Sequence, residues 1–303
     1  MLPNESNCEL APALVRALFC GLLRQEHRVA VFVASADEST GRTHTDPFLF
    51  GGFVARERLW SKSFAPLWDR RVLAGPPRIP YLHMADIKSP KWCAEHGLTQ
   101  DDAERRLDAA FELIDRAGGL YPVAYRVDAG HLRSAFAEAE VKLVIKTEGG
   151  IARRAFEPDY ICFLQWAFRV LRYVEQQYPD AENVDFVIER NGRITKHLHR
   201  FHTSMAKVLS DLGADRLARL MGDFSVGGKE RVPLQAADLL VWHTQAAQAG
   251  SLSVSDERRY DKLAHHQGWL EEATDDEITN FARRAKEALL DPNDEDADAL
   301  DLA

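Results

Sequence analysis

The chain has 303 residues, of which 46% are hydrophobic and 28% are charged, so it can bury a large core and does not have the composition of a disordered protein. Its formal charge of −9 argues against a general nucleic-acid binder, but six of the acidic residues lie in the terminal stretch Asp291–Ala303. Removing those six from the formal charge leaves −3, so global charge decides little about partners.

The cysteines are scattered and form no C-x-x-C pair, which predicts reduced thiols and does not favour a zinc site. The apolar stretch Leu10–Leu23 is too short to span a bilayer, and no positively charged region precedes it as in a signal peptide. We predict a helix over Ala13–Arg24 that packs on the body, and a cytoplasmic protein with no membrane partner.

The stretch Arg28–Ser39 begins with apolar β-formers and ends on two acidic residues, Asp37 and Glu38. A short, unbroken apolar run predicts a strand buried on both faces, and aspartate is a poor strand former, so we expect the strand to end at Asp37. Strand ends are where α/β sheets present chemistry. The alternative is that Asp37 only opens the turn Ser39-Thr40-Gly41; Glu38 is expected on the opposite face of the strand.

A second strand, Phe48–Ala55, is predicted as the hairpin partner of the first. The pair Gly51-Gly52 would weaken this strand unless a bulge or a close backbone approach requires it. The segment Trp60–Pro80 is assigned only in part, as loop, because of its glycine and prolines. A short extended piece, Tyr81–Asp86, is expected to present His83 and Asp86.

Two long helices are predicted further along the chain. Thr99–Gly119 begins with a capping-box-like pair, and the apolar residues of Pro158–Tyr178 wrap nearly all the way round, which predicts burial on several sides. Between them we predict a strand over Leu120–Val127 and a helix between His131 and Thr147.

The strand Asn183–Arg190 alternates apolar and polar residues and carries Glu189 near its end. A helix over Lys196–Leu212 and a last strand within Arg216–Val226 are expected next. Pro233–Gln248 is predicted as a core helix, and the remainder to Leu290 as polar helical material. No repeat or clean linker is visible, so we predict one elaborated domain at 1–290, with its core at about 28–250, and an acidic, disordered tail at 291–303.

Three acidic residues stand at informative places in this scheme: Asp37, Glu189, and Asp238 in the second turn of the Pro233–Gln248 helix. Carboxylates from strand ends and a helix can converge on Mg²⁺, which prefers oxygen ligands. Two such ions would stabilise both the attacking and the leaving oxygen in the cleavage of a phosphodiester.

Each carboxylate also has a purely structural interpretation. Asp238 could only complement the helix dipole, and Glu189 could be a solvated strand end beside the turn Asn191-Gly192. The small residues Ala236-Ala237 favour close packing of the helix on the sheet, which weakens the first of these interpretations.

The segments Ala36–Gly41, Gly51-Gly52 and Pro233–Leu240 resemble the bacterial family called domain of unknown function 3800. Its signatures are an Asp-Glu-Ser-Gly-like strand end and a Leu-Gln-x-Ala-Asp-Leu helix; this chain departs from the first by inserting Thr40. A further departure is Gly227–Glu230, where an acidic-serine turn is expected.

The resemblance implies an α/β fold with a ribonuclease H-like mixed sheet flanked by helices, with helical insertions here, and a metal-dependent nuclease-like site. Asp37 and Asp238 match acidic positions of the two motifs, Glu189 matches an acid on an intermediate strand, and His83 matches a histidine after the second strand.

The segment Arg193–His202 places basic residues just after Glu189, as a phosphate-backbone substrate requires; the cationic candidates are Arg193, Lys196 and Arg200. A solvated basic face is the alternative. Its histidines do not favour a metal site, because 197 and 199 point in different directions on a helix.

The resulting hypothesis is a hydrolase that cleaves nucleic-acid phosphodiesters with Mg²⁺ or Mn²⁺, RNA and DNA being undistinguished. Asp37, Glu189 and Asp238 would be catalytic and hold the metal, and His83 is also assigned to the catalytic set, with Asp86 a further candidate for proton transfer or metal ligation. The alternative is a non-catalytic binding or partner protein of a defence or mobile-element system, in which the acidic tail would suit a basic protein partner.

Overall fold

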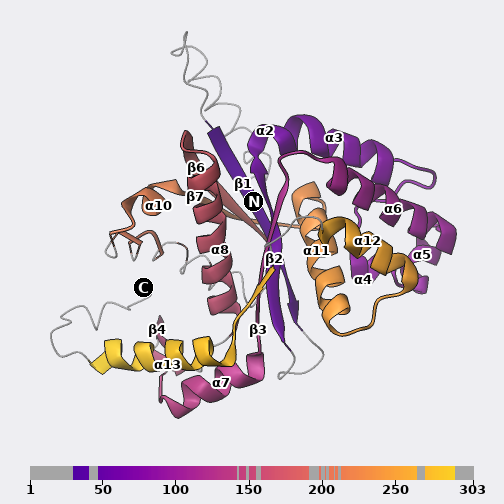
Figure 1. Ribbon diagram of the computed structural model, residues 1–303. Helices are drawn as coiled ribbons and strands as arrows, with labels where there is room; N and C mark the ends of the chain where they lie inside the picture. The colour runs from indigo at the N-terminus through magenta and orange to yellow at the C-terminus, as the bar shows by residue number, and fades with distance from the viewer. Residues whose placement is uncertain are drawn as a thin grey trace, which may run out of the picture.

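The computed structural model describes residues 30–40, 47–141, 143–147, 150–154, 158–190, 213–264 and 270–290, together with single positions and short pieces between 198 and 210. A six-stranded mixed sheet in the order β7-β6-β1-β2-β3-β8 forms the centre of the molecule (Figure 1). The strands, including a separate β4-β5 hairpin, are β1 (Ala30–Thr40), β2 (Phe48–Arg56), β3 (Tyr121–Val127), β4 (Leu143–Thr147), β5 (Gly150–Arg154), β6 (Ala181–Glu189), β7 (Met221–Gly227) and β8 (Leu270–Glu272).

Strands β1, β2 and β3 form an antiparallel meander, and β6 joins the other side of β1 in parallel orientation. Parallel pairing continues from β6 to β7, and β8 adds in parallel to β3. The α/β class with a mixed sheet is therefore as expected from the sequence.

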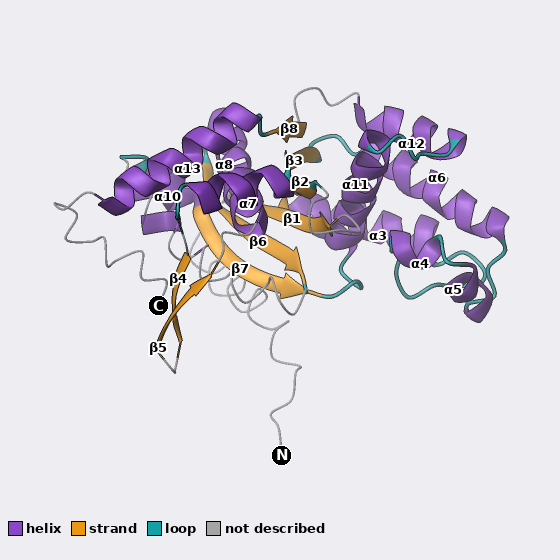
Figure 2. Ribbon diagram, turned by 90° about the horizontal axis from the view of Figure 1, so that it is seen from below, coloured by secondary structure: helices purple, strands orange, loops and turns teal. Residues whose placement is uncertain are grey.

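The helical segments lie on both sides of this sheet (Figure 2). They are α2 (Glu57–Leu59), η2 (Trp60–Phe64), α3 (Ala65–Trp68), η3 (Asp69–Leu73), α4 (Met84–Ile87), α5 (Pro90–Glu95), α6 (Gln100–Arg116), α7 (Ala129–Glu138), α8 (Pro158–Gln177), α10 (Asp215–Leu220), α11 (Val232–Gln248), α12 (Val254–Ala264) and α13 (Asp275–Leu290).

Two hydrophobic cores lie on opposite faces of the sheet. Helix α8 packs on β2 and β3 on one face, and α11 packs on β1 and β2 on the other (Figure 1). Within β1, Ala34 and Ala36 belong to the α8 core, whereas Val33 contacts the α11 core. The alternation of a strand therefore places Ser35 and Asp37 on the α11 face and Glu38 on the α8 face.

Strand β1 does not end at Asp37, as the sequence predicts, but continues to Thr40. Its parallel pairing with β6 ends at the pair Ala36–Ile188, whereas its antiparallel pairing with β2 continues to the pair Thr40–Phe48. Asp37 therefore lies where β1 loses its pairing with β6 and becomes an edge of the sheet, which continues through β2 and β3. The prediction was wrong because hairpin partners can extend a strand beyond its apolar run.

The glycines of β2 are explained by a close backbone approach. A Cβ on Gly52 would lie 1.8 Å from the carbonyl oxygen of Ser35, and one on Gly51 would lie 2.7 Å from the Cβ of Ala124. The pairing of β1 with β2 runs in continuous register, without a bulge. Of the two explanations offered by the sequence, close approach is confirmed.

Residues 57–73, left largely unassigned from the sequence, form one helical run in which α-helical and π-helical turns alternate. Trp60, Phe64, Trp68 and Val72 are buried along it. Residues four apart overshoot a full α-helical turn by about 40°, so the wider π-turns bring this row back to one face. Ring centroids of Trp60 and Phe64 lie 5.2 Å apart, and those of Phe64 and Trp68 lie 5.4 Å apart.

The prediction of a helix between His131 and Thr147 is wrong for the second half of that segment. Helix α7 ends at Glu138, Glu140 takes a left-handed φ of 60°, and the chain then forms β4. The β-branched pair Val144-Ile145 is typical of a strand rather than a helix.

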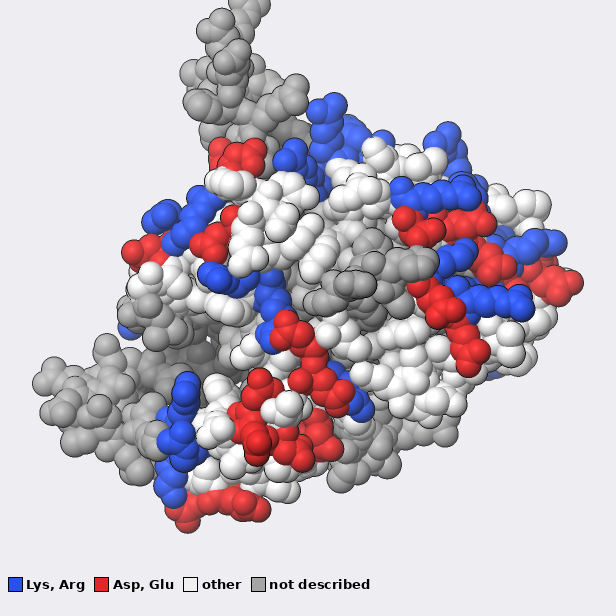
Figure 3. Space-filling view, in the orientation of Figure 1, with Lys and Arg blue, Asp and Glu red and all other residues white. Residues whose placement is uncertain are grey.

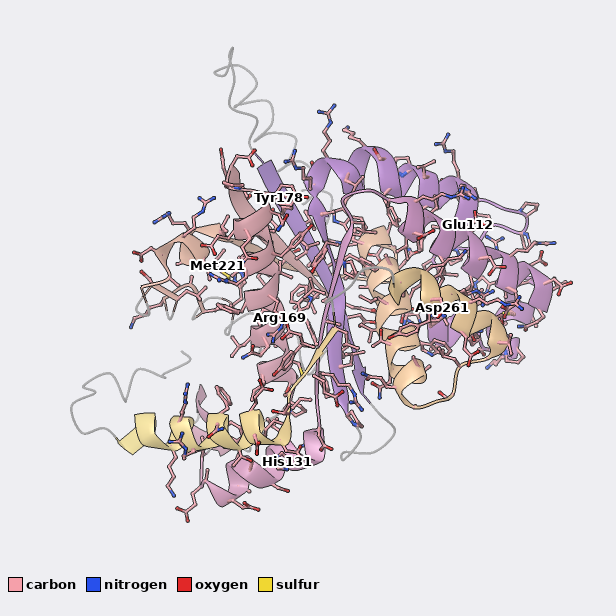
Figure 4. All side chains as sticks on the ribbon, viewed as in Figure 1. Glu112, His131, Arg169, Tyr178, Met221 and Asp261 are labelled. Carbon is pink, nitrogen blue, oxygen red and sulfur yellow. The ribbon has the colours of Figure 1, made fainter. Side chains whose placement is uncertain are left out.

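The bounds of the other principal helices and strands agree closely with those predicted from the sequence. Thr99 and Asp102 form a reciprocal capping box at the start of α6, and α8, β6 and α11 have nearly the expected bounds. Phe168 of α8 is 39% exposed, so that helix is not buried all round. Strand β8 was not expected; its Glu271 forms an ion pair with Arg169 of α8. Arg169 is labelled in Figure 4.

The acidic tail at 291–303 and the helix expected over Ala13–Arg24 lie outside the described residues. Among the described helices, none is both long and apolar enough to cross a membrane. Charge is distributed unevenly: Figure 3 shows basic side chains along the end formed by α2 and α3, where Arg58, Lys62 and Arg70 are exposed.

Candidate functional site: a buried carboxylate cluster

Asp37 and Glu189 lie on neighbouring parallel strands and on the same face of the sheet. The last register pair of β1 and β6 is Ala36 with Ile188, and each acid is the next residue of its strand. Val184, Phe186 and Ile188 belong to the α8 core, so the alternation of β6 directs Glu189 toward the α11 face. This register places the two acids next to each other where the pairing of β1 with β6 ends.

Helix α11 brings the third carboxylate to the same place. The helix starts against β1, where the Ser35 hydroxyl donates to the carbonyl oxygen of Pro233 at 3.0 Å. Ala236 and Ala237 are fully buried, as expected for a helix lying close on the sheet. Asp238 is only 7% exposed, and its Oδ2 accepts a hydrogen bond of 2.6 Å from the backbone N–H of Met84.

The three carboxyl groups are close enough to shift one another's pKa. Burial raises the pKa of Asp37 well above its usual range, and the charges of Asp238, Glu189 and Glu38 raise it further. Burial also raises the pKa of Glu189, although Lys229 and a hydrogen bond from the Asp37 carboxyl oppose the shift. Asp37 and Glu189 therefore titrate as a pair that can share a proton.

The pKa of Asp238 is likewise set by opposing effects. Burial raises its pKa to about 7, against the opposing hydrogen bond from Met84, and the charge of Glu189 adds to the increase. Three acids brought together in this way favour either bound protons or a neighbouring cation.

His83 and Asp86 join the cluster from the N-terminal end of α4. His83 Nε2 lies 3.6 Å from Asp238 Oδ1, and the Nζ of Lys229 lies 3.3 Å from His83 Nδ1 and 3.0 Å from Asp86 Oδ2. Burial, and then the charge of Lys229, lower the pKa of His83. The expectation that this segment is extended is wrong for Asp86, which lies in α4.

Gln235 fixes the segments around the cluster. Its Oε1 accepts from the Trp68 indole N–H at 2.8 Å and from the backbone N–H of Leu82 at 3.1 Å. Its Nε2 donates to the carbonyl oxygen of Lys229 at 2.9 Å. One buried amide thus connects α3, the segment leading to His83, and the loop that carries Lys229.

The donor chemistry of the cluster fits a hard divalent cation, since Asp37, Glu189 and Asp238 supply carboxylate oxygens. Across the described residues, however, no group of three or more His, Cys, Asp or Glu side chains has the arrangement of a metal site. The cluster therefore fits a divalent cation in its ligand type and charge, but the carboxylates would have to reorient to bind one.

Lys229 is the functional candidate that sequence reasoning missed. It lies in Gly227–Glu230, the segment noted only as a departure from the family pattern. The basic candidates Arg193, Lys196 and Arg200 lie outside the described residues. The sequence signal that could have identified Lys229 is its place directly after Gly227-Gly228 and just before α11, the helix that carries Asp238.

Comparisons of the chain with models of known protein families, with curated proteins and with solved structures find no match.

Proposed function

We propose that the protein is a divalent-metal-dependent hydrolase of nucleic-acid phosphodiesters, with Asp37, Glu189 and Asp238 as its metal-holding carboxylates. The observation that carries this proposal is the convergence of three buried or half-buried acids whose pKa values are all raised by burial. The charges of Asp238 and Glu189 raise the pKa of Asp37 further, and the charge of Glu189 raises that of Asp238. Such a cluster has unfavourable charge in isolation, and a divalent cation would relieve it.

Mg²⁺ or Mn²⁺ bound here would supply Lewis-acid stabilisation of phosphoryl oxygens and an activated water. The protein's own groups have distinct parts in this scheme. Met84 N–H orients the Asp238 carboxylate, and Lys229 provides a positive charge that would attract a phosphate to the cluster.

The ribonuclease H-like assignment and membership in the domain of unknown function 3800 family belong to the same proposal. Supporting it are a mixed sheet with helices on both faces and the two signature motifs, whose acids Asp37 and Asp238 interact electrostatically.

The decisive experiment incubates the protein with RNA, single-stranded DNA and duplex DNA in the presence of Mn²⁺ and compares wild type with Asp238→Asn. We expect cleavage of at least one substrate, and a loss of at least about a hundredfold in the variant, the scale typical of a lost catalytic group. Asp185→Asn is the matched control, because Asp185 lies on the same face of β6 but accepts from the backbone N–H of Asp223. Equal behaviour of wild type and Asp238→Asn on every substrate contradicts the proposal.

A second candidate function is a binding protein that keeps the fold without catalysis. Lys229 already offsets part of the acidic charge, and the described carboxylates are not arranged as a finished metal site, which favours this alternative. Thermal unfolding with added Mg²⁺ or Mn²⁺ separates the two. Metal at a hundredfold excess over Kd should add about 2.7 kcal/mol of stability to a metal-binding protein and none to the alternative.

A further inference from the structure

His83 has an acidic neighbour at each ring nitrogen, so its hydrogen positions decide what it can do. Asp238 Oδ1 lies 3.6 Å from Nε2, and Asp86 Oδ2 lies 3.3 Å from Nδ1. A neutral imidazole carries one proton and can place it at either nitrogen. The carboxylates alone therefore leave two tautomers open.

Lys229 removes this ambiguity. Its ammonium group hydrogen-bonds to Nδ1 at 3.3 Å and to Asp86 Oδ2 at 3.0 Å. An ammonium group has three donors and no acceptor, so Nδ1 must offer a lone pair and the ring proton must lie on Nε2. With the proton there, Nε2–H faces the Asp238 carboxylate; the other tautomer would direct a lone pair at that carboxylate and an N–H at a cation.

The backbone of Lys229 is anchored, and its side chain is 37% exposed. Gln235 Nε2 donates to its backbone carbonyl, and the ring of Tyr81 lies 5.6 Å from its Nζ. Gln235 in turn accepts from Trp68 and Leu82, so the packed body of the protein holds the backbone from which the Lys229 side chain reaches His83.

We infer that Lys229 is a positioning residue that holds His83 as the neutral Nε2–H tautomer, with the N–H directed at Asp238. His83 then acts as a hydrogen-bond donor: it supports the Asp238 carboxylate, or donates to a phosphate oxygen bound beside it. In this tautomer Nε2 has no lone pair, so His83 serves neither as a metal ligand nor as a general base through that atom. This consequence for catalysis rests on the proposed function, whereas the tautomer itself does not.

The test is ¹⁵N NMR of histidine-labelled full-length protein at about pH 8, without metal or nucleic acid. The His83 signals are those lost in His83→Gln. In wild type we expect Nδ1 to resonate as an unprotonated nitrogen and Nε2 as a protonated one. In Lys229→Met, Nδ1 should gain a proton and donate to Asp86, while Lys229→Arg, which also has only donors, should restore the wild-type pattern.

A protonated Nδ1 in wild type, or an unchanged His83 pattern in Lys229→Met, overturns the inference. Far-UV circular dichroism and the remaining histidine signals establish that each variant is folded. Because no metal or substrate is present, failure of this test is distinct from failure of the proposed nuclease activity.

Discussion

Asp238 is a carboxyl group buried among other acids, and its pKa of about 7 reflects how unfavourable its charge is there. Since the folded pKa lies above the ordinary value of 3.8, the folded state binds the proton more tightly than the unfolded state. The stability that this group contributes is complete below the unfolded pKa and is lost as the pH rises through about 7.

Asp238→Asn should therefore stabilise the metal-free protein at about pH 8, by up to about 4 kcal/mol, and have little effect below about pH 4. The asparagine keeps an oxygen that can accept from Met84 N–H and carries no charge to desolvate. Urea unfolding with a chelator present, at both pH values, measures the difference. The exposed Asp261→Asn serves as control, and a variant less stable than wild type at pH 8 would refute the electrostatic account.

The residue types of the cluster could be predicted from the sequence, but their connections could not. Asp37, Glu189 and Asp238 each follow from a local pattern, the first two from apolar runs and the third from a helical motif. The contact of Lys229 with His83 depends on a loop conformation fixed through Gln235. Such side-chain geometry is set by tertiary packing, which the hydrophobic periodicity of the sequence does not reveal.

At the scale of elements, the β1-β2 hairpin carries Asp37 into the site, and its geometry depends on Gly52. The nearest atoms to a Cβ at this position are the carbonyl oxygen and carbon of Ser35 and the Cα of Ala36, all backbone. A methyl group there cannot be accommodated by a side-chain rotation, so the strands would have to separate.

We expect Gly52→Ala to destabilise the protein by about 1–3 kcal/mol or more, the cost of overpacking a filled interior. It should also weaken any function of the cluster, because β1 would move with Asp37. Gly118→Ala is the control, since nothing lies within 4 Å of its added Cβ, and it should be neutral or stabilising by about 0.4–1 kcal/mol. Denaturant unfolding of both variants is the measurement; equal midpoints would mean that β2 tolerates a side chain at position 52.

Elements were predictable from the sequence where one physical signal dominated. Helix α6 has a capping box and one apolar face, and α11 has Pro at its first turn. The run Trp60–Leu73 had no such signal, because its buried residues repeat every four positions, a period longer than the 3.6 residues of a regular α-helix. The π-turns that resolve this mismatch are rare, so the sequence favours them only in hindsight.

At the scale of the whole molecule, the carboxylate cluster lies where the central sheet meets helix α11. Strand β1 contributes to the cores on both faces, and α11 carries Gln235, which hydrogen-bonds to Trp68 of α3 and to the loop of Lys229. Free energy gained or lost at the carboxylates is therefore expected to appear in the unfolding of the whole domain and not only in a local loop.

The last prediction follows from that position. Protons and a divalent cation compete for the same carboxylates, so metal affinity should rise with pH. The stability gained from a fixed Mg²⁺ concentration should thus be small at about pH 5 and should grow to a few kcal/mol at about pH 8, once the pKa of about 7 at Asp238 is passed.

Thermal unfolding with Mg²⁺ and with a chelator, measured across this pH range, gives the gain at each pH as a difference in which the other titrating groups largely cancel. Asp37→Asn should remove most of the gain, whereas Asp185→Asn should keep it. A gain that is independent of pH, or that survives in Asp37→Asn, would mean that any Mg²⁺ effect arises away from the cluster, and the binding-protein alternative would then be favoured.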